Sequence, residues 1–183
     1  RTGGNKPVLI MAHGSSDDGA CWTNLAVEFA AQYDIVMYDA RGHGLSDPPK
    51  ADDPADAQAE DLAALIKALN ITKPIVMGHS MGGAGALFLG SKYASNWAAL
   101  AGIAPAAFMM LNERKEYLSK INNANIPIMI VQGDKDTAVP ATYTRQWIDA
   151  MKEIGMRHKY IELPGGDHGT VISDGMPDIF KIF

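Results

Sequence analysis

A short string near the middle of the sequence has the residue types of a serine nucleophile. Gly78-His79-Ser80-Met81-Gly82 fits the pattern Gly-x-Ser-x-Gly, which places a serine on a sharp turn between a strand and a helix. The string is short enough to occur by chance, but an apolar run at 74–77 precedes it and small residues at 83–87 follow it. Glycines suit such a turn, because side chains there would collide with the neighbouring strand and helix. We therefore predict that Ser80 is a nucleophile; the alternative is a glycine-rich turn whose serine caps a helix.

A serine hydroxyl needs a base that takes its proton, and a histidine supported by a carboxylate meets this need. His168, in the glycine-rich loop 165–169, is the candidate base, and a surface histidine is the alternative. Two carboxylates, Asp134 and Asp136, follow the apolar run 126–132. We favour Asp136 as the acid, because Asp134 can instead cap its own loop. The resulting chain order of serine, aspartate and histidine accompanies the Gly-x-Ser-x-Gly motif and predicts a catalytic triad.

A serine nucleophile also needs backbone N–H groups that hold the developing oxyanion. The residue after the nucleophile supplies one, so we predict Met81, and the loop after the first apolar run supplies the other, with Ser15 as the candidate. The hydroxyl of Ser16 either contacts substrate or faces water. Residues with the size and apolarity of a pocket wall, for which a core position is an equal alternative, are Trp22, Phe108, Met109 and Val139.

These residues must be positioned by a framework, and the hydrophobic pattern indicates its class. Short apolar runs without alternation recur between amphipathic segments, as in a parallel sheet covered by helices on both faces. The predicted strands are 8–12, 34–39, 74–78, 97–104, 126–132 and 158–163. The predicted helices are 21–32, 57–69, 81–92, 111–121, 141–154 and 176–183. We therefore predict an α/β fold, a three-layer α/β/α sandwich with a mainly parallel sheet of about six strands, as one domain over residues 1–183.

Composition narrows the partners and the location. The 16 Lys and Arg residues are outnumbered by 21 Asp and Glu, and no basic cluster occurs, so a nucleic-acid partner is disfavoured. The single cysteine, Cys21, excludes an internal disulfide and a thiolate metal cage. No apolar run reaches the roughly 18 residues of a membrane span. We expect a cytoplasmic location; the chain opens with Arg1 rather than with Met. The oligomeric state is left open.

Together these motifs resemble the α/β-hydrolase superfamily, from the first predicted strand to the last predicted helix. The resemblance is carried by His13-Gly14 with Trp22, Asp39-x-Arg41-Gly42-His43-Gly44-x-Ser46, Gly78 to Gly82, Gly133-x-x-Asp136 with Pro140, and Gly166-x-His168. It implies a carboxylesterase that cleaves a small-molecule or polymeric ester through an acyl-enzyme intermediate, without metal or organic cofactor. It also implies that 39–47 is a structural turn bracing the oxyanion loop, and it places the acid at Asp136.

Three departures from the family pattern shape further expectations. Only residues 1–7 precede the first predicted strand, where family members usually have additional strands, so strand 34–39 is expected to be a bare sheet edge. A short stretch at 105–125 stands where a lid domain is often inserted, which predicts an open cleft. The half up to the serine motif is similar to lid-bearing hydrolases and residues from Gly102 onward to lidless esterases. A recombined, trimmed or engineered chain is therefore a hypothesis.

A shared fold leaves other functions open. The same triad serves thioesterases, lactonases, amidases, perhydrolases and carbon–carbon bond hydrolases, and these sister chemistries are the first alternative to an esterase. The second alternative is a ligand-sensing receptor or a scaffold of low activity. A receptor would need a large partner surface around a lidded cavity, and this sequence has no evident lid.

Overall fold

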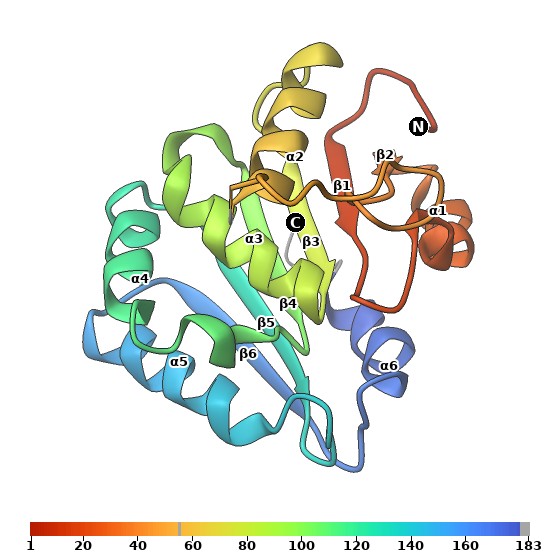
Figure 1. The fold of residues 1–183 in the computed structure, drawn as a ribbon. Helices are drawn as coiled ribbons and strands as arrows, with labels where there is room; N and C mark the ends of the chain where they lie inside the picture. Colours follow the sequence, from red (N-terminus) through yellow and green to blue (C-terminus); the bar gives the residue numbers. More distant parts are fainter. Residues whose placement is uncertain (55, 180–183) are drawn as a thin grey trace.

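The computed structural model describes residues 1–54 and 56–179 and places six parallel strands in one sheet (Figure 1). The strands are β1 (Val8–Ala12), β2 (Asp34–Met37), β3 (Ile75–His79), β4 (Ala99–Ile103), β5 (Ile128–Gly133) and β6 (His158–Leu163). They lie in the order β2-β1-β3-β4-β5-β6, and every neighbouring pair is parallel. The carboxyl ends of all six strands therefore meet at one edge of the sheet, where loops converge.

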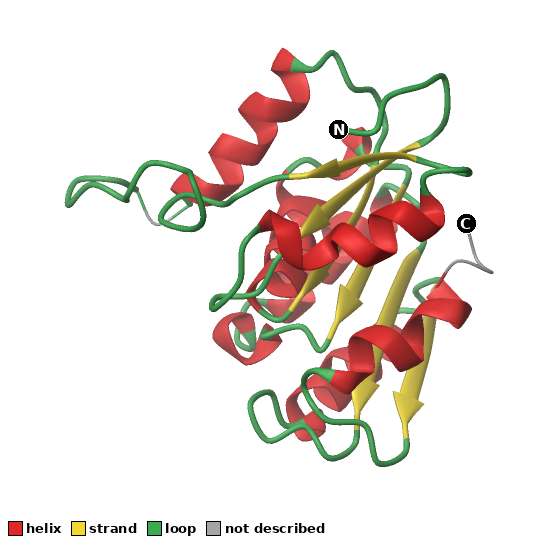
Figure 2. Cartoon of the chain, turned by 90° about the vertical axis from the view of Figure 1, so that its right-hand side faces the viewer, coloured by secondary structure: helices red, strands yellow, loops and turns green. Residues whose placement is uncertain are grey.

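Helices cover both faces of this sheet, which confirms the predicted three-layer α/β fold (Figure 2). The helices are α1 (Thr23–Phe29), α2 (Ala57–Ala68), α3 (Met81–Lys92), α4 (Arg114–Asn123), α5 (Ala141–Glu153) and α6 (Thr170–Ile179), with short 3-10 turns η1 (Gly19–Trp22), η2 (Ala94–Asn96) and η3 (Ala107–Met110). Helices α1 and α6 pack on one face and α2 to α5 on the other. In the described part of the chain, no helix has both the length and the apolarity to cross a bilayer.

Alternation along the strands explains why both faces are apolar. Leu9 and Met11 of β1 pack in the cluster under α1 and α6, whereas Ile10 packs in the cluster under α2 to α5. A strand that is covered on both faces carries apolar residues at every position, so its sequence shows a continuous run rather than alternation. This is the pattern from which the parallel sheet was predicted.

The last helix begins earlier than predicted, at Thr170 rather than at residue 176. Asp167 Oδ1 accepts hydrogen bonds from the N–H groups of Gly169 and Thr170, and Thr170 Oγ1 accepts one from the N–H of Asp167. These reciprocal bonds cap the helix and fix its first turn. Gly175, which interrupts the helical pattern in the sequence, is needed because a β-carbon there would lie 2.6 Å from Cγ1 of Val131 on β5. Residues 180–183 of the predicted helix lie outside the described residues.

The expectation of a bare sheet edge at β2 was wrong. The first residues of the chain lie along the outer edge of this strand. Thr2 N–H donates to the carbonyl oxygen of Ile35 at 3.0 Å, and Thr2 Oγ1 accepts from the N–H of Ile35 at 2.8 Å. The buried carboxylate of Asp34 binds the Arg1 guanidinium at 2.6 and 2.8 Å and the Gly3 N–H at 2.7 Å. The Arg1 hydrogen bond is the main reason that the pKa of Asp34 lies below its usual value. The segment therefore covers part of the edge that would otherwise be open to pairing.

Candidate active site

The predicted nucleophile, Ser80, lies on the turn between β3 and α3. Its backbone has a conformation that residues other than glycine rarely adopt. Its φ is +53° and its ψ is −115°. Three backbone hydrogen bonds hold this conformation: Ser80 N–H donates to the Ile103 carbonyl at 2.9 Å, and the Ser80 carbonyl accepts from Ala84 and Ala106 at 3.0 and 2.9 Å. The neighbouring strand β4 and the loop after it therefore fix the turn from outside.

Close backbone approach explains the two glycines of the motif. A β-carbon at Gly78 would overlap the carbonyl group of Gly82, and a β-carbon at Gly82 would overlap the carbonyl group of Ala12 at the end of β1. A side chain at either position would force β1, β3 and α3 apart. The glycines are therefore required by the packing of the turn, as the sequence motif predicts.

The predicted base and acid contact each other. His168 Nδ1 lies 2.7 Å from Oδ2 of Asp136, whose side chain is fully buried. Asp136 Oδ1 also accepts from the N–H groups of Ala138 and Val139 at 2.9 and 2.7 Å, which fixes the carboxylate. Asp134 does not contact the imidazole; its Oδ1 accepts from the Gly165 N–H at 2.7 Å and links two loops. The structure thus brings Asp136 rather than Asp134 to His168.

Gln132, which the sequence analysis did not single out, holds the same carboxylate from below. Its buried side chain donates to Asp136 Oδ2 and to the Val139 carbonyl, both at 3.1 Å. Its Oε1 accepts from Thr144 Oγ1 of α5 at 2.7 Å, so each polar atom of the amide has a partner. The signal in the sequence was a polar residue near the end of an apolar strand. Such a residue is buried only when partners exist.

His79 connects the nucleophile turn to the base. Its Nε2 lies 2.8 Å from the carbonyl oxygen of His168, and the two imidazole rings are 4.5 Å apart between centroids. Among the described residues, no hydrogen bond joins Ser80 Oγ to His168. Bonds between nucleophile and base are often looser in the absence of substrate and tighten in the reactive complex. The elements that carry the triad are therefore tied together through the residue before the serine.

The predicted oxyanion loop passes directly beside the nucleophile. A β-carbon at Gly14 would lie 3.6 Å from Cβ of Ser80 and 3.3 Å from Nδ1 of His79. His13 fixes the loop, because its Nε2 accepts from the Ala40 N–H at 2.9 Å, which leaves Nδ1 protonated to donate to the Gly14 carbonyl at 2.7 Å. Ser15 is the next residue of this loop, and Met81 is the first residue of α3, directly after Ser80, so the assignment of their N–H groups as oxyanion donors stays a prediction.

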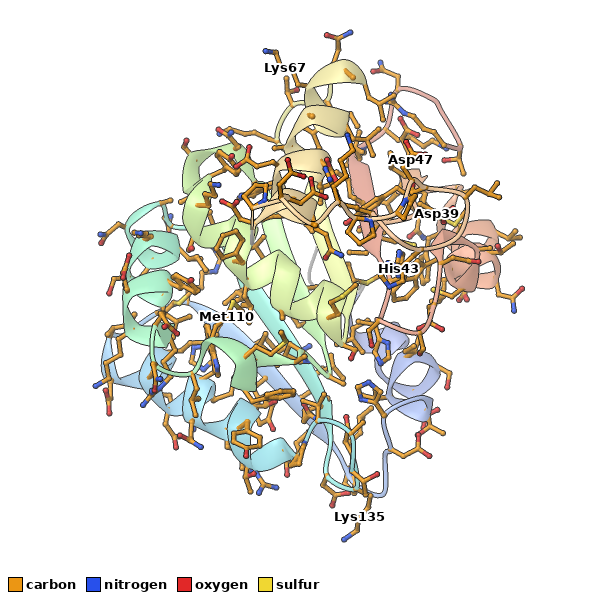
Figure 3. All side chains as sticks on the ribbon, viewed as in Figure 1. Asp39, His43, Asp47, Lys67, Met110 and Lys135 are labelled. Carbon is orange, nitrogen blue, oxygen red and sulfur yellow. The ribbon has the colours of Figure 1, made fainter. Side chains whose placement is uncertain are left out.

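The loop after β2 braces the oxyanion loop (Figure 3). His43 Nε2 lies 3.0 Å from the Ser15 carbonyl, which joins the two loops. Asp39 accepts from the N–H groups of Leu45 and Gly19 at 2.9 and 2.7 Å, and these bonds hold the pKa of its carboxyl below the usual value. The resemblance implied a structural turn at 39–47. The hydrogen bonds of Asp39 and His43 hold this loop and join it to the loop that contains Ser15.

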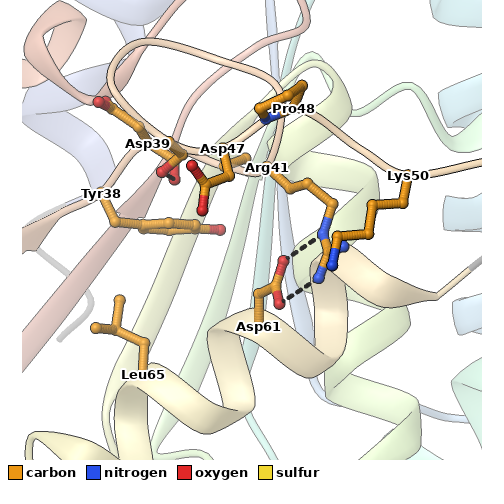
Figure 4. Close-up of a pocket in the computed structure, with 10 residues that line it drawn as sticks. Tyr38, Asp39, Arg41, Asp47, Pro48, Lys50, Asp61 and Leu65 are labelled. Atoms are coloured by element: carbon orange, nitrogen blue, oxygen red, sulfur yellow. Dashed lines mark hydrogen bonds and ion pairs between the residues drawn. The ribbon is translucent and has the colours of Figure 1, made fainter. Parts of the chain in front are cut away.

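A charged cavity of about 480 Å³ lies next to this loop, and its arginine is already paired (Figure 4). Arg41 binds both carboxylate oxygens of Asp61 at 2.8 Å and also pairs with Asp53. The Asp61 hydrogen bonds are the main reason that the pKa of Arg41 is raised. The guanidinium therefore ties the loop 41–53 to α2 and is already occupied by carboxylates.

The candidate pocket walls divide into exposed and buried residues. Phe108 and Met109 of η3 are 42% and 68% exposed, and Ser16 lines an open polar groove with Ser15 and His43. Trp22 and Val139 are only 1% and 2% exposed. Trp22 packs in the core under α1, and Val139 packs against Ala84 and Ala106. For these two residues the core position, the equal alternative in the sequence analysis, is the one observed, whereas substrate contact stays a prediction for Phe108, Met109 and Ser16.

Comparison with known proteins identifies the family. The family model described as alpha/beta hydrolase fold matches residues 7–120. The chain belongs to the α/β-hydrolase family. A second model, described as prolyl oligopeptidase family, matches residues 109–179.

Similar proteins carry several different activities in their names. The chain is 36% identical over 86 residues to 3-oxoadipate enol-lactonase 1 of Acinetobacter baylyi. The matched segment covers 47% of this chain and 32% of that protein. It is 40% identical over 79 residues to a putative esterase/lipase of Haemophilus influenzae, covering 43% and 27%. The fold is similar to that of a bromoperoxidase from Bacillus anthracis, with a TM-score of 0.79, 17% identity and coverage of 98% and 92%. The matches thus span about a third or less of the curated relatives, and the structural likeness shows the fold alone.

The buried ring of His79 makes the stability of this α/β hydrolase depend on pH. Burial lowers the pKa of His79, and Nδ1 has no hydrogen-bond partner among residues 1–54 and 56–179. The hydrogen bond to the His168 carbonyl opposes this effect, the charge of the His168 ring lowers the pKa further, and Asp17 and Asp136 raise it, with burial the largest contribution. The unfolded chain takes up a proton on this residue at about pH 6.5, but the folded chain takes it up only at lower pH. The free energy of unfolding should therefore decrease as pH falls below about 6.5.

Urea unfolding of the wild type and of His79→Gln at pH 7.5 and 5.5 measures this dependence. Gln retains an N–H donor for the His168 carbonyl but does not titrate, so the variant should lose less stability between the two pH values. His158→Gln is the matched control, because His158 is half-buried at the start of β6, outside the site. An equal pH dependence in all three proteins would contradict the assignment to His79.

Proposed function

We propose that this α/β hydrolase cleaves carboxylic ester bonds through an acyl-enzyme on Ser80. The observation that carries the proposal is the 2.7 Å bond from His168 to the buried carboxylate of Asp136, formed beside the turn that presents Ser80. A carboxylate on Nδ1 keeps the proton on that nitrogen and leaves Nε2 free as the base. A serine beside such an imidazole has the activation that acyl transfer requires.

In the proposed mechanism, His168 Nε2 takes the Ser80 proton while Ser80 Oγ attacks the ester carbonyl carbon. The N–H groups of Met81 and Ser15 hold the oxyanion of the tetrahedral intermediate. The intermediate collapses when His168 returns the proton to the leaving alcohol, which leaves the acyl group on Ser80. Water, deprotonated by His168, then attacks the acyl carbon and releases the carboxylic acid. Asp136 stays ionised and stabilises the imidazolium form of His168 in both steps.

A second acyl substrate follows from the same geometry. Ser80 can attack any activated carbonyl carbon that reaches the turn, and one of the relatives is named as an enol-lactonase. Only a short loop and η3 lie between β4 and α4, so the described part of the chain places no lid domain over the site. An open site admits cyclic as well as linear esters. A lactone is therefore the second substrate to test.

Covalent labelling tests the proposed function directly. An alkyl fluorophosphonate should form one adduct per chain, and mass spectrometry of peptides should place it on Ser80, because a phosphonate bound to an activated serine resembles the tetrahedral intermediate. The Ser80→Ala variant should take up no label. Ser119→Ala, on the exposed face of α4, should label like the wild type. Hydrolysis of p-nitrophenyl acetate by a protein that takes no label at Ser80 would contradict the proposal.

A further inference from the structure

An apolar groove of about 570 Å³ runs along α3 and starts at the residue after the nucleophile. Met81, Ala84, Gly85 and Phe88 of α3 form its floor, at the i, i+3, i+4 and i+7 positions of one helix face. Met109 and Met110 of η3 form one wall, and the start of α2 forms the other. Figure 3 shows Met110 beside α3 on the side of the sheet that carries α4 and α5. We call this feature the α3 groove.

Gly85 distinguishes the floor of the α3 groove from the rest of the helix. A β-carbon at Gly82, Gly83 or Gly90 of α3 would press on other parts of the protein, so packing explains these glycines. A β-carbon at Gly85 would meet no atom within 4 Å. Glycine is unfavourable inside a helix compared with alanine, and nothing in the described protein occupies the space that Gly85 leaves. The missing side chain deepens the groove for something outside the chain.

The far end of the α3 groove is closed by aromatic and charged groups. The rings of Phe88 and Tyr117 meet edge to face with centroids 5.9 Å apart. Behind them, Lys92 pairs with Asp56 at 2.7 Å and with Glu60. A helical rise of about 1.5 Å per residue puts Phe88 about 10 Å beyond Met81, a length that an extended acyl chain of about eight carbons spans. A longer chain would reach the ion pairs, where apolar atoms gain nothing.

We infer that the α3 groove binds the acyl chain of a medium-chain ester, an inference that rests on the proposed function. The leaving alcohol must lie next to His168, which donates its proton to it. His168 lies between β6 and α6, and α6 covers the opposite face of the sheet from α2 to α5. The acyl chain therefore points away from His168, toward α3. Met81 joins the two sites, because its N–H is the proposed oxyanion donor and the residue also lines the groove.

A chain-length series with a constant leaving group tests the inference. The kcat/KM for p-nitrophenyl octanoate should exceed that for the acetate on the order of 10²-fold, since each buried methylene contributes up to about fourfold. The dodecanoate should give no further gain. In Gly85→Leu, the added side chain fills the floor, so the ratio of kcat/KM for the octanoate to that for the acetate should fall about tenfold. Gly85→Ala should lie between the two proteins and, as a better helix former, should remain folded.

The matched control is Ala64→Leu, which adds similar volume on the exposed face of α2 outside the α3 groove and should leave the series unchanged. An unchanged ratio of octanoate to acetate in both Gly85 variants would overturn the inference. So would a series in which the alcohol of alkyl acetates, rather than the acyl chain, responds to Gly85→Leu. Failure of the proposed function itself is recognised separately, because Ser80 would then take no fluorophosphonate and no ester would be hydrolysed.

Discussion

Replacing Ser80 with alanine is expected to lower kcat for p-nitrophenyl esters by about 10⁶, because a working triad loses nearly all of its rate when the nucleophile is removed. The backbone of the turn is fixed by Ile103, Ala84 and Ala106, so loss of the hydroxyl alone should leave the fold intact. Initial rates on purified protein, with circular dichroism and urea unfolding as checks of folding, measure the effect. Ser119→Ala should retain the wild-type rate. A Ser80→Ala protein that hydrolyses esters at an undiminished rate would defeat the acyl-enzyme mechanism.

Replacing Asp136 with asparagine is expected to lower kcat by about 10⁴, because an amide no longer holds the proton on Nδ1 of His168. The change also alters the bonds from Ala138, Val139 and Gln132, so stability should be measured beside activity. Fluorophosphonate labelling should slow in parallel with kcat, since both reactions need the same base.

Asp134→Asn is the matched control for this experiment. Asp134 is in the same loop, two residues away, but binds the Gly165 N–H instead of the imidazole. Its amide oxygen can still accept that bond, so kcat should stay within about tenfold of the wild type. If Asp134→Asn removed activity while Asp136→Asn retained it, the acid would be assigned to the wrong carboxylate.

The sequence predicted the elements best where the pattern was continuous. The bounds of β1 and α3 agree with the prediction, because a continuous apolar run ends at His13 and the Gly-x-Ser-x-Gly motif marks the start of α3. The bounds of β6 also agree, although this strand opens with two polar residues. The start of α6 was missed because its cap begins at Asp167, inside the loop that had been assigned to the base, and is completed by Thr170 just after that loop. The covered edge of β2 was missed because the contacts of Arg1 and Thr2 depend on the tertiary fold.

The sequence predicted the candidate catalytic residues, but it did not predict the residues that hold them in place. The motif around Ser80 and the order of Asp136 and His168 nominated the triad, whose roles stay predictions until activity is measured. Nothing local in the sequence separated Asp136 from Asp134, since both bind the loop 165–169 and the difference lies in which carboxylate reaches the His168 imidazole. Gln132 and the α3 groove were missed for the same reason. The contacts of the buried Gln132 amide, and the empty space beside Gly85, depend on neighbours from other elements.

The hydrogen bond from the Ala106 N–H to the Ser80 carbonyl lies between two segments, one that fixes Ser80 and one that borders the opening of the site. Along the segment after β4, the last of the backbone hydrogen bonds that fix the Ser80 turn is made by Ala106. The short stretch that stands in place of a lid domain, η3 and the loop before α4, comes after it. Insertions or deletions between Ala106 and α4 would therefore change access to the site without moving the attacking atom. Access to the site and the position of the reactive oxygen are thus set by different segments, so the one can change in length while the other is kept.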